Sequence, residues 1–181
     1  MRILLTGGSA CGKSSYAENL AVQCPAPRYY VAAMKPYGCG SRERIDRHRE
    51  TRKGKGFTTI ERYDDPAGLI LPERGVVLLE CMCNLTANEM FDDVGNVHDP
   101  FDGLMRGIKA LEAQCDTLIV VTNDVGSGVG VHDPGTMLYI ETLGRVNAAL
   151  AARFDAVYEL VCGMPIAIKA SSKNPEIKAC Q

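Results

Sequence analysis

The sequence predicts an α/β fold in which helices flank a central, mainly parallel β-sheet. Short apolar runs rich in β-branched residues alternate with helix-like or polar stretches along the 181 residues. Strands are expected at residues 2–6, 28–33, 76–80, 117–122 and 156–161, and helices at residues 13–23, 41–52, 84–91, 101–115 and 135–154. Because strands and helices alternate, we expect neighbouring strands to be parallel and joined by helical crossovers.

The first strand and helix enclose a glycine-rich loop. The loop reads Gly7-Gly8-Ser9-Ala10-Cys11-Gly12-Lys13-Ser14, which satisfies the pattern of a phosphate-binding P-loop in its usual strand–loop–helix context. Backbone N–H groups and the helix N-terminus would surround phosphate oxygens. Lys13 would contact the β and γ phosphates, and the Ser14 hydroxyl would ligate Mg²⁺. The fold is therefore expected to be P-loop NTPase-like, with a nucleoside triphosphate as ligand.

The second helix is dense in cations and almost devoid of apolar residues. Arg44 and Arg52 lie four residues on either side of His48 and share its face of the helix. In one interpretation this is a solvated, charge-balanced helix. In the other, the flanking positive charge favours a neutral, nucleophilic imidazole, and the arginines bind the triphosphate under attack. His98 and His132 follow turn-like sequences and are expected to be loop residues.

Two later strands end in polar residues. Glu80 closes the buried strand 76–80, and Asn123 and Asp124 follow the strand 117–122. Ligands of α/β sheets bind at the carboxyl ends of the strands, so these residues are site candidates. Glu80 could orient Mg²⁺ and water, accept hydrogen bonds from a base or ribose, or simply be a solvated acid.

The last predicted helix, 135–154, carries apolar residues at helical spacing. This stripe is typical of a helix that packs on a core or on a second subunit. It consists of Met137, Ile140, Leu143, Val146 and Leu150.

Composition limits the classes of protein. A hydrophobic content of 46% allows one sizeable core, so we expect a single domain over residues 1–169 and a flexible tail at 170–181. The net charge of −2 argues against a general nucleic-acid binder. No apolar run approaches the roughly 20 residues of a membrane span, and no leader precedes the first strand, so a cytoplasmic location is expected. The eight cysteines are expected to be reduced, because no leader is seen and the core is large enough without disulfides, and their spacing forms no recognisable zinc pattern.

Several motifs together resemble one enzyme family. The P-loop with Ala17-Glu18 is followed by Tyr30-Val31-Ala32-Ala33, by Arg44-Ile45-x-x-His48 with Arg52, and by Thr58-Thr59-Ile60-Glu61. Further on come Leu78-Leu79-Glu80-Cys81, Val121-Thr122-Asn123-Asp124-Val125-Gly126, Gly144-Arg145-Val146-Asn147 and Gly163-Met164-Pro165. In this order they resemble the bifunctional adenosylcobinamide kinase/adenosylcobinamide-phosphate guanylyltransferase family of cobalamin biosynthesis.

The resemblance implies two reactions. The γ-phosphoryl group of ATP or GTP passes to the aminopropanol hydroxyl of adenosylcobinamide, and GMP then passes from GTP to that phosphate through a guanylyl-histidine. His48 occupies the position of the family's histidine. The implied GTP site comprises the P-loop together with Ala33, Met34, Lys35, Arg49, Glu50, Thr51, Arg52, Glu61 and Glu80, and the implied assembly is a homotrimer.

The chain departs from the family pattern at a few positions. Arg47 stands where the family often has a second histidine, Ala33-Met34 replaces a Thr-Ser pair, and Asp124 replaces a glutamate. The alternatives left open by the residues are a monofunctional P-loop kinase and a nucleotide-dependent regulatory module. The corrinoid pocket is expected between subunits or along residues 124–130.

Overall fold

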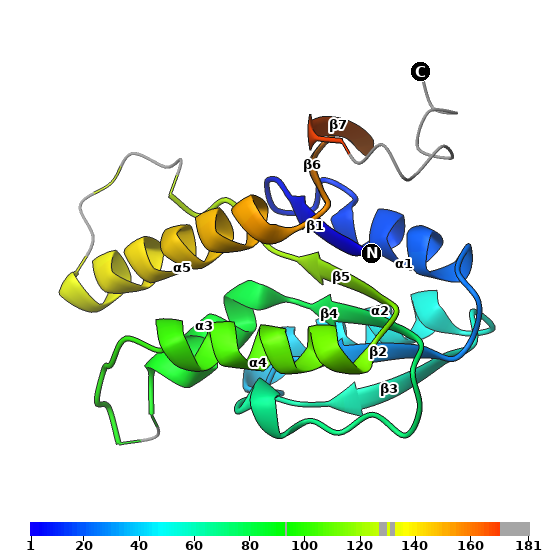
Figure 1. Ribbon diagram of the computed structural model, residues 1–181. Helices are drawn as coiled ribbons and strands as arrows, with labels where there is room; N and C mark the ends of the chain where they lie inside the picture. The colour runs from blue at the N-terminus through cyan, green and yellow to red at the C-terminus, as the bar shows by residue number, and fades with distance from the viewer. Residues whose placement is uncertain (93, 127–129, 131–132, 171–181) are drawn as a thin grey trace.

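The computed structural model describes residues 1–92, 94–126, 130 and 133–170 (Figure 1). Seven strands form one sheet in the order β3-β2-β4-β5-β1-β6-β7. All neighbouring strands are parallel except β6 and β7, which form an antiparallel hairpin. The strands are β1 (Arg2–Thr6), β2 (Arg28–Ala32), β3 (Phe57–Glu61), β4 (Val76–Glu80), β5 (Thr117–Val121), β6 (Ala156–Val161) and β7 (Met164–Lys169).

Helices cover both faces of the sheet. They are α1 (Lys13–Val22), α2 (Gly38–Arg52), α3 (Met82–Met90), α4 (Phe101–Gln114) and α5 (Pro134–Arg153), with a short 3₁₀ turn η1 (Pro66–Gly68). From β1 to β3 the chain moves towards one edge of the sheet, and from β4 to β6 it moves towards the other. Because the crossovers are right-handed, α1 and α2 lie on one face, and α3, α4 and α5 lie on the opposite face. Figure 1 shows α3 and α4 in front of the sheet and α2 behind it.

The core lies along the central strands. Val77, Leu78 and Leu79 of β4 and Leu118 and Ile119 of β5 are fully buried, as expected for parallel strands covered on both faces. The apolar stripe of α5 packs on this core through Leu143, Val146 and Leu150, whereas Met137 at its first turn is half exposed. No helix in the described ranges has the length and apolarity that a membrane crossing requires.

The predicted fold class is confirmed, and the elements differ in detail. All five predicted strands and all five helices are present, with ends shifted by up to three residues; α2, for example, begins at Gly38 instead of Ser41. Two strands were missed. β3 is mostly exposed, and β7 is an edge strand whose Met164, Ile166 and Ile168 face solvent, so neither has the apolar pattern of a buried strand. Residues 171–181 of the predicted tail lie outside the described residues.

Candidate active site

The P-loop connects β1 to α1 and depends on two glycines. Gly7 has φ +133°, and a Cβ atom there would lie 2.6 Å from the Leu160 carbonyl oxygen. Gly12 has φ +96° and packs against Gly163, whose N–H donates to the Cys11 carbonyl at 2.9 Å. A side chain at Gly7 is therefore excluded by both conformation and space, and one at Gly12 would be strained by its positive φ and would press on Gly163. The β6–β7 turn, which the sequence analysis did not connect with the site, supports the loop from outside.

Lys13 and Ser14 begin α1 and point into the loop. The Lys13 ammonium group is buried and donates to the carbonyl oxygens of Gly7 at 2.9 Å and Gly8 at 2.6 Å. The ammonium group is a compact positive charge with three donors, and it lies at the mouth of the loop. Such a group is suited to phosphate oxygens. The Ser14 hydroxyl donates to a carboxylate oxygen of Glu80.

Glu80 joins three elements at the carboxyl edge of the sheet. It ends β4, which is separated from β1 by β5, and its carboxylate accepts from Ser14 of α1. His48 of α2 approaches the same carboxylate, with Nδ1 4.0 Å from Oε1. The Glu80 carboxylate is therefore not a solvated acid, which was one of the three possibilities for it. It lies between the P-loop and His48.

The surroundings of His48 differ from the sequence-based picture of an imidazole between two guanidinium groups. Arg52 turns away to the face of Tyr30, with its guanidinium carbon 3.5 Å from the ring centroid. It is 7% exposed, and in the described part of the chain its Nε and Nη1 have no hydrogen-bond partner. Arg44 lines the same two cavities as His48. The helix pattern alone could not reveal the acidic neighbour, because Glu80 lies on a distant strand.

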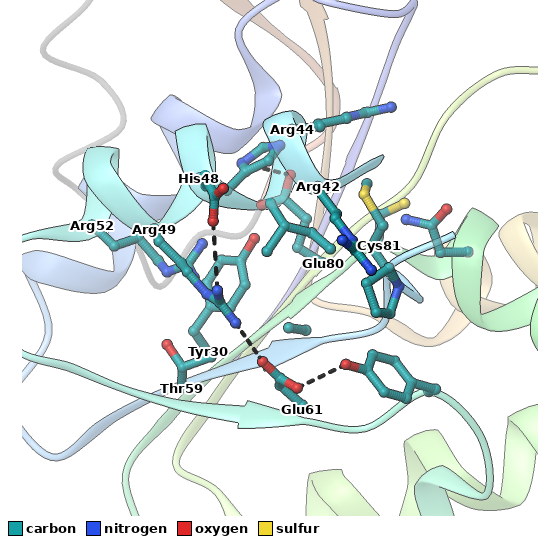
Figure 2. A pocket seen from close by; sticks show the side chains of 17 residues that line it. Tyr30, Arg42, Arg44, His48, Arg49, Arg52, Thr59, Glu61, Glu80 and Cys81 are labelled. Atoms are coloured by element: carbon teal, nitrogen blue, oxygen red, sulfur yellow. Dashed lines mark hydrogen bonds and ion pairs between the residues drawn. The ribbon is translucent and has the colours of Figure 1, made fainter. Parts of the chain in front are cut away.

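Two cavities meet at His48. One of about 490 Å³ opens over the P-loop and is also lined by Arg47 and Thr51 of α2. The other, of about 270 Å³, lies between α2 and the ends of β2, β3 and β4 (Figure 2). Arg44, His48, Glu80 and Cys81 line both. A ligand that extends from one cavity into the other would pass the imidazole.

The smaller cavity has an aromatic and acidic floor. Glu61 at the end of β3 accepts from Arg49 and from the Tyr63 hydroxyl, each at 2.7 Å. The Tyr63 hydrogen bond, followed by that of Arg49, lowers the pKa of Glu61, so the carboxylate is charged at neutral pH. Burial and, secondarily, the negative charge of Glu80 raise the pKa of Tyr30, which remains a neutral phenol. The cavity thus offers carboxylates, guanidinium groups and an aromatic face to a ligand.

Most residues predicted for the site line these cavities. The larger cavity includes Ser9, Ala10, Cys11, Gly12, Lys13, Ser14 and Thr51, and the smaller includes Met34, Arg49, Arg52 and Glu61. Ala33 is buried behind them, and its N–H donates to the Glu80 carbonyl at 3.0 Å.

Other predicted residues lie outside the cavities. Glu50 is exposed and pairs with Lys53. Lys35 extends over Tyr37, with its Nζ 5.8 Å from the ring centroid. His98 lines neither cavity, and His132 is outside the described residues. The loop 124–130, one expected place for the corrinoid, is described only in part.

Sequence reasoning missed some cavity residues. These are Tyr30, Thr59 and Tyr63, which line the smaller cavity. The end of β3 is the signal that could have found Tyr63, had that strand been predicted. Asn123, which was predicted as a site candidate, does line the larger cavity. Each cysteine for which the structure describes a bonding state is free, including Cys11, Cys81 and Cys83.

Side chains alone form no metal site within the described residues. No three His, Cys, Asp or Glu side chains there lie close enough together to hold an ion. The Ser14–Glu80 pair at the P-loop fits the usual alternative, in which a serine hydroxyl, water and nucleotide phosphates share Mg²⁺.

Comparison with known proteins identifies the family. A family model described as cobinamide kinase / cobinamide phosphate guanyltransferase matches residues 3–168. Bifunctional adenosylcobalamin biosynthesis protein CobU of Escherichia coli K12 is 32% identical over 93% of this chain and its whole length. The protein of that name from Salmonella typhimurium LT2 is 31% identical over the same shares, and CobP of Pseudomonas aeruginosa is 27% identical over 93% of this chain and 98% of its own.

One solved structure is similar in fold at low sequence identity. The ATPase domain of G40P aligns with a TM-score of 0.47 and 8% identity, covering 87% of this chain and 68% of that chain. With the family model matched over nearly the entire chain, the chain belongs to the cobinamide kinase / cobinamide phosphate guanyltransferase family.

Proposed function

We propose that this enzyme phosphorylates the aminopropanol hydroxyl of adenosylcobinamide and then transfers GMP from GTP to the resulting phosphate, with His48 as the covalent carrier. Family membership supports both reactions. The observation that carries the assignment of His48 is its position between the two cavities, beside the carboxylate that Ser14 contacts.

The phosphoryl-transfer half belongs to the P-loop. ATP or GTP would place its β and γ phosphates against the loop N–H groups and Lys13, and positioning plus charge neutralisation supply most of the catalysis in such reactions. Mg²⁺, held by Ser14 and phosphate oxygens, would neutralise charge on the nucleotide. Glu80 then has the role of orienting the Ser14 hydroxyl.

The guanylyl-transfer half belongs to α2. With the triphosphate in the larger cavity and the guanosine in the smaller one, the α-phosphorus would lie at their boundary. Glu80 is on the Nδ1 side of His48, so Nε2 is the nitrogen free to attack. A P–N bond forms as the P–O bond to pyrophosphate breaks, and Arg44, Arg47 and Lys13 lie where they can stabilise the leaving group. A phosphate oxygen of adenosylcobinamide phosphate then attacks the same phosphorus and restores the imidazole.

We also propose that the GTP site comprises the P-loop, residues 33–35 and 49–52, Glu61 and Glu80. The proposed substrates are GTP, ATP and a corrinoid, and the proposed metal is Mg²⁺. By resemblance we propose a homotrimer of single-domain subunits, residues 1–169, in the cytoplasm.

The test is covalent labelling. The protein is incubated with Mg²⁺ and GTP labelled at the α-phosphorus, denatured and mapped by peptide, beside His48→Ala and, as a matched control, His98→Ala. We expect acid-labile, alkali-stable label on His48 in the wild type and the control, and none in His48→Ala. Unlabelled wild-type protein, or label that persists in His48→Ala, would remove His48 as carrier and leave a simple P-loop kinase.

A further inference from the structure

The helix that carries His48 is weakly buried. Among the side chains of α2 that the structure describes, Arg52 alone is buried. Contacts with the sheet come from His48 to Glu80, from Arg49 to Glu61 and from Arg52 to Tyr30. All three contacts use side chains that line the smaller cavity, where a guanosine bound as proposed would compete for them.

A further ion pair joins the segment that ends α2 to the P-loop helix, and both of its members lie outside the cavities. Glu18 lies one helical turn after Ser14 on α1 and is 1% exposed. Its Oε2 pairs at 2.5 Å with Nζ of Lys55, just after α2, and its Oε1 is 3.5 Å from the Thr51 hydroxyl. Neither Glu18 nor Lys55 lines either cavity, so ligand does not displace this pair.

The contact reaches the backbone of the histidine. The Thr51 hydroxyl donates at 3.0 Å to the His48 carbonyl oxygen, in the helical turn that presents the imidazole. Its single proton serves one acceptor at a time, so the Lys55 ion pair is the firm link between Glu18 and the end of α2. A buried carboxylate without a partner is costly, which keeps Lys55 on Glu18. α1 fixes Lys13 and Ser14 at its start, and the same helix therefore sets the position of His48 relative to the phosphates.

We propose that Glu18 is a positioning residue for guanylyl transfer, acting through Lys55 to fix α2 over the P-loop. The proposal rests on the proposed function, in which His48 attacks the α-phosphorus. Phosphoryl transfer from the P-loop to the corrinoid does not need the imidazole, so loss of the Glu18 contact should separate the two activities.

The test compares Glu18→Gln and Lys55→Gln with Lys55→Arg and Lys53→Gln. Glu18→Gln keeps the side-chain length and Lys55→Gln shortens it by one atom; each removes one charge of the pair. Lys55→Arg keeps the charge, and Lys53→Gln removes an exposed lysine that pairs with Glu50 one turn away. Single-turnover labelling of His48 at saturating α-labelled GTP gives the transfer rate, and corrinoid phosphorylation by ATP gives the kinase rate.

We expect labelling by both glutamine variants to be about 10–100-fold slower, because small misplacements of a reacting group cost that much. The KM for GTP and the kinase rate should stay within about twofold of the wild type, and Lys55→Arg and Lys53→Gln should label at the wild-type rate. Equal loss of both activities in the glutamine variants, or normal labelling, would overturn the positioning role. Should Glu18→Gln fail to fold, Lys55→Gln decides by the same criteria. Absence of His48 label in the wild type would instead reject the proposed function.

Discussion

Replacing Arg52 with methionine should weaken nucleotide binding without weakening the fold. Arg52 is almost fully buried against Tyr30, and its Nε and Nη1 have no hydrogen-bond partner within the described residues. A buried guanidinium group with free donors costs folding energy, and the smaller cavity, which it lines, is where a ligand could use those donors.

The expected magnitudes differ for binding and for stability. Two hydrogen bonds from a charged donor contribute about 1.5–3 kcal/mol each, so their loss should raise the Kd by about 100-fold or more. For the fold, a desolvated cation–π contact contributes about 2 kcal/mol, and the penalty of the unpaired buried cation is of similar or greater size. Methionine also packs well on an aromatic ring. The free energy of unfolding should therefore fall by no more than about 1 kcal/mol, or rise.

Arg28→Met provides the matched control. Arg28 donates to three carbonyl oxygens at the end of α1, those of Ala21 at 2.9 Å, Val22 at 2.9 Å and Cys24 at 2.7 Å. It lines neither cavity. These bonds are partly buried or exposed and so contribute less than buried ones; their loss should lower the free energy of unfolding by at least about 2 kcal/mol and leave nucleotide affinity unchanged.

The assay uses calorimetric titration with α,β-methylene-GTP, which cannot lose pyrophosphate, together with urea unfolding of the free protein. The opposite outcome would be an Arg52→Met protein that is destabilised as much as Arg28→Met and binds the analogue with wild-type affinity. Arg52 would then be a structural residue.

Two further predictions concern the same cavity. Burial raises the pKa of Tyr30 above its unfolded value of about 10, so the stability that depends on its neutral form is complete below pH 10 and is lost as the pH rises beyond it. Urea unfolding at pH 9 and 11 should show a loss about 1.4 kcal/mol smaller in Tyr30→Phe than in the wild type, and an equal loss would mean that Tyr30 ionises freely in the folded protein. Asn88 of α3 donates to the carbonyl oxygens of Ala33 at 2.8 Å and Tyr63 at 2.9 Å, which joins the loops after β2 and β3. Asn88→Ala should weaken binding of α,β-methylene-GTP about tenfold, and unchanged affinity would show that these loops are positioned by other contacts.

The phosphate loop and the sheet could be predicted from sequence because their signals are local. Gly7, Gly12 and Lys13 have fixed spacing between a strand and a helix, and the backbone geometry they require is the geometry observed. The strands β3 and β7 were missed because an exposed edge strand does not need the apolar residues by which buried strands are recognised.

Interactions between distant segments could not be predicted in the same way. The helical period places Arg52 on the face of His48, and that inference is geometrically sound for an isolated helix. It fails because Tyr30 offers Arg52 an aromatic face and Glu80 brings a carboxylate to His48, and both lie on strands whose order in the sheet the sequence does not encode locally. The candidate residues were predictable, but their pairings were not.

The sheet order explains how one fold can present two chemistries. β5 lies between β1 and β4, so the ends of β1 and β4 are separated by one strand, and a side chain at the end of β4 can reach across to the P-loop serine. β2 and β3 lie beyond β4, and their ends form the smaller cavity. Glu80 therefore stands between a phosphate cavity and a second cavity, and α2 crosses above it with His48 at the boundary. A nucleotide that spans both cavities would therefore place its α-phosphorus at their boundary, where His48 lies.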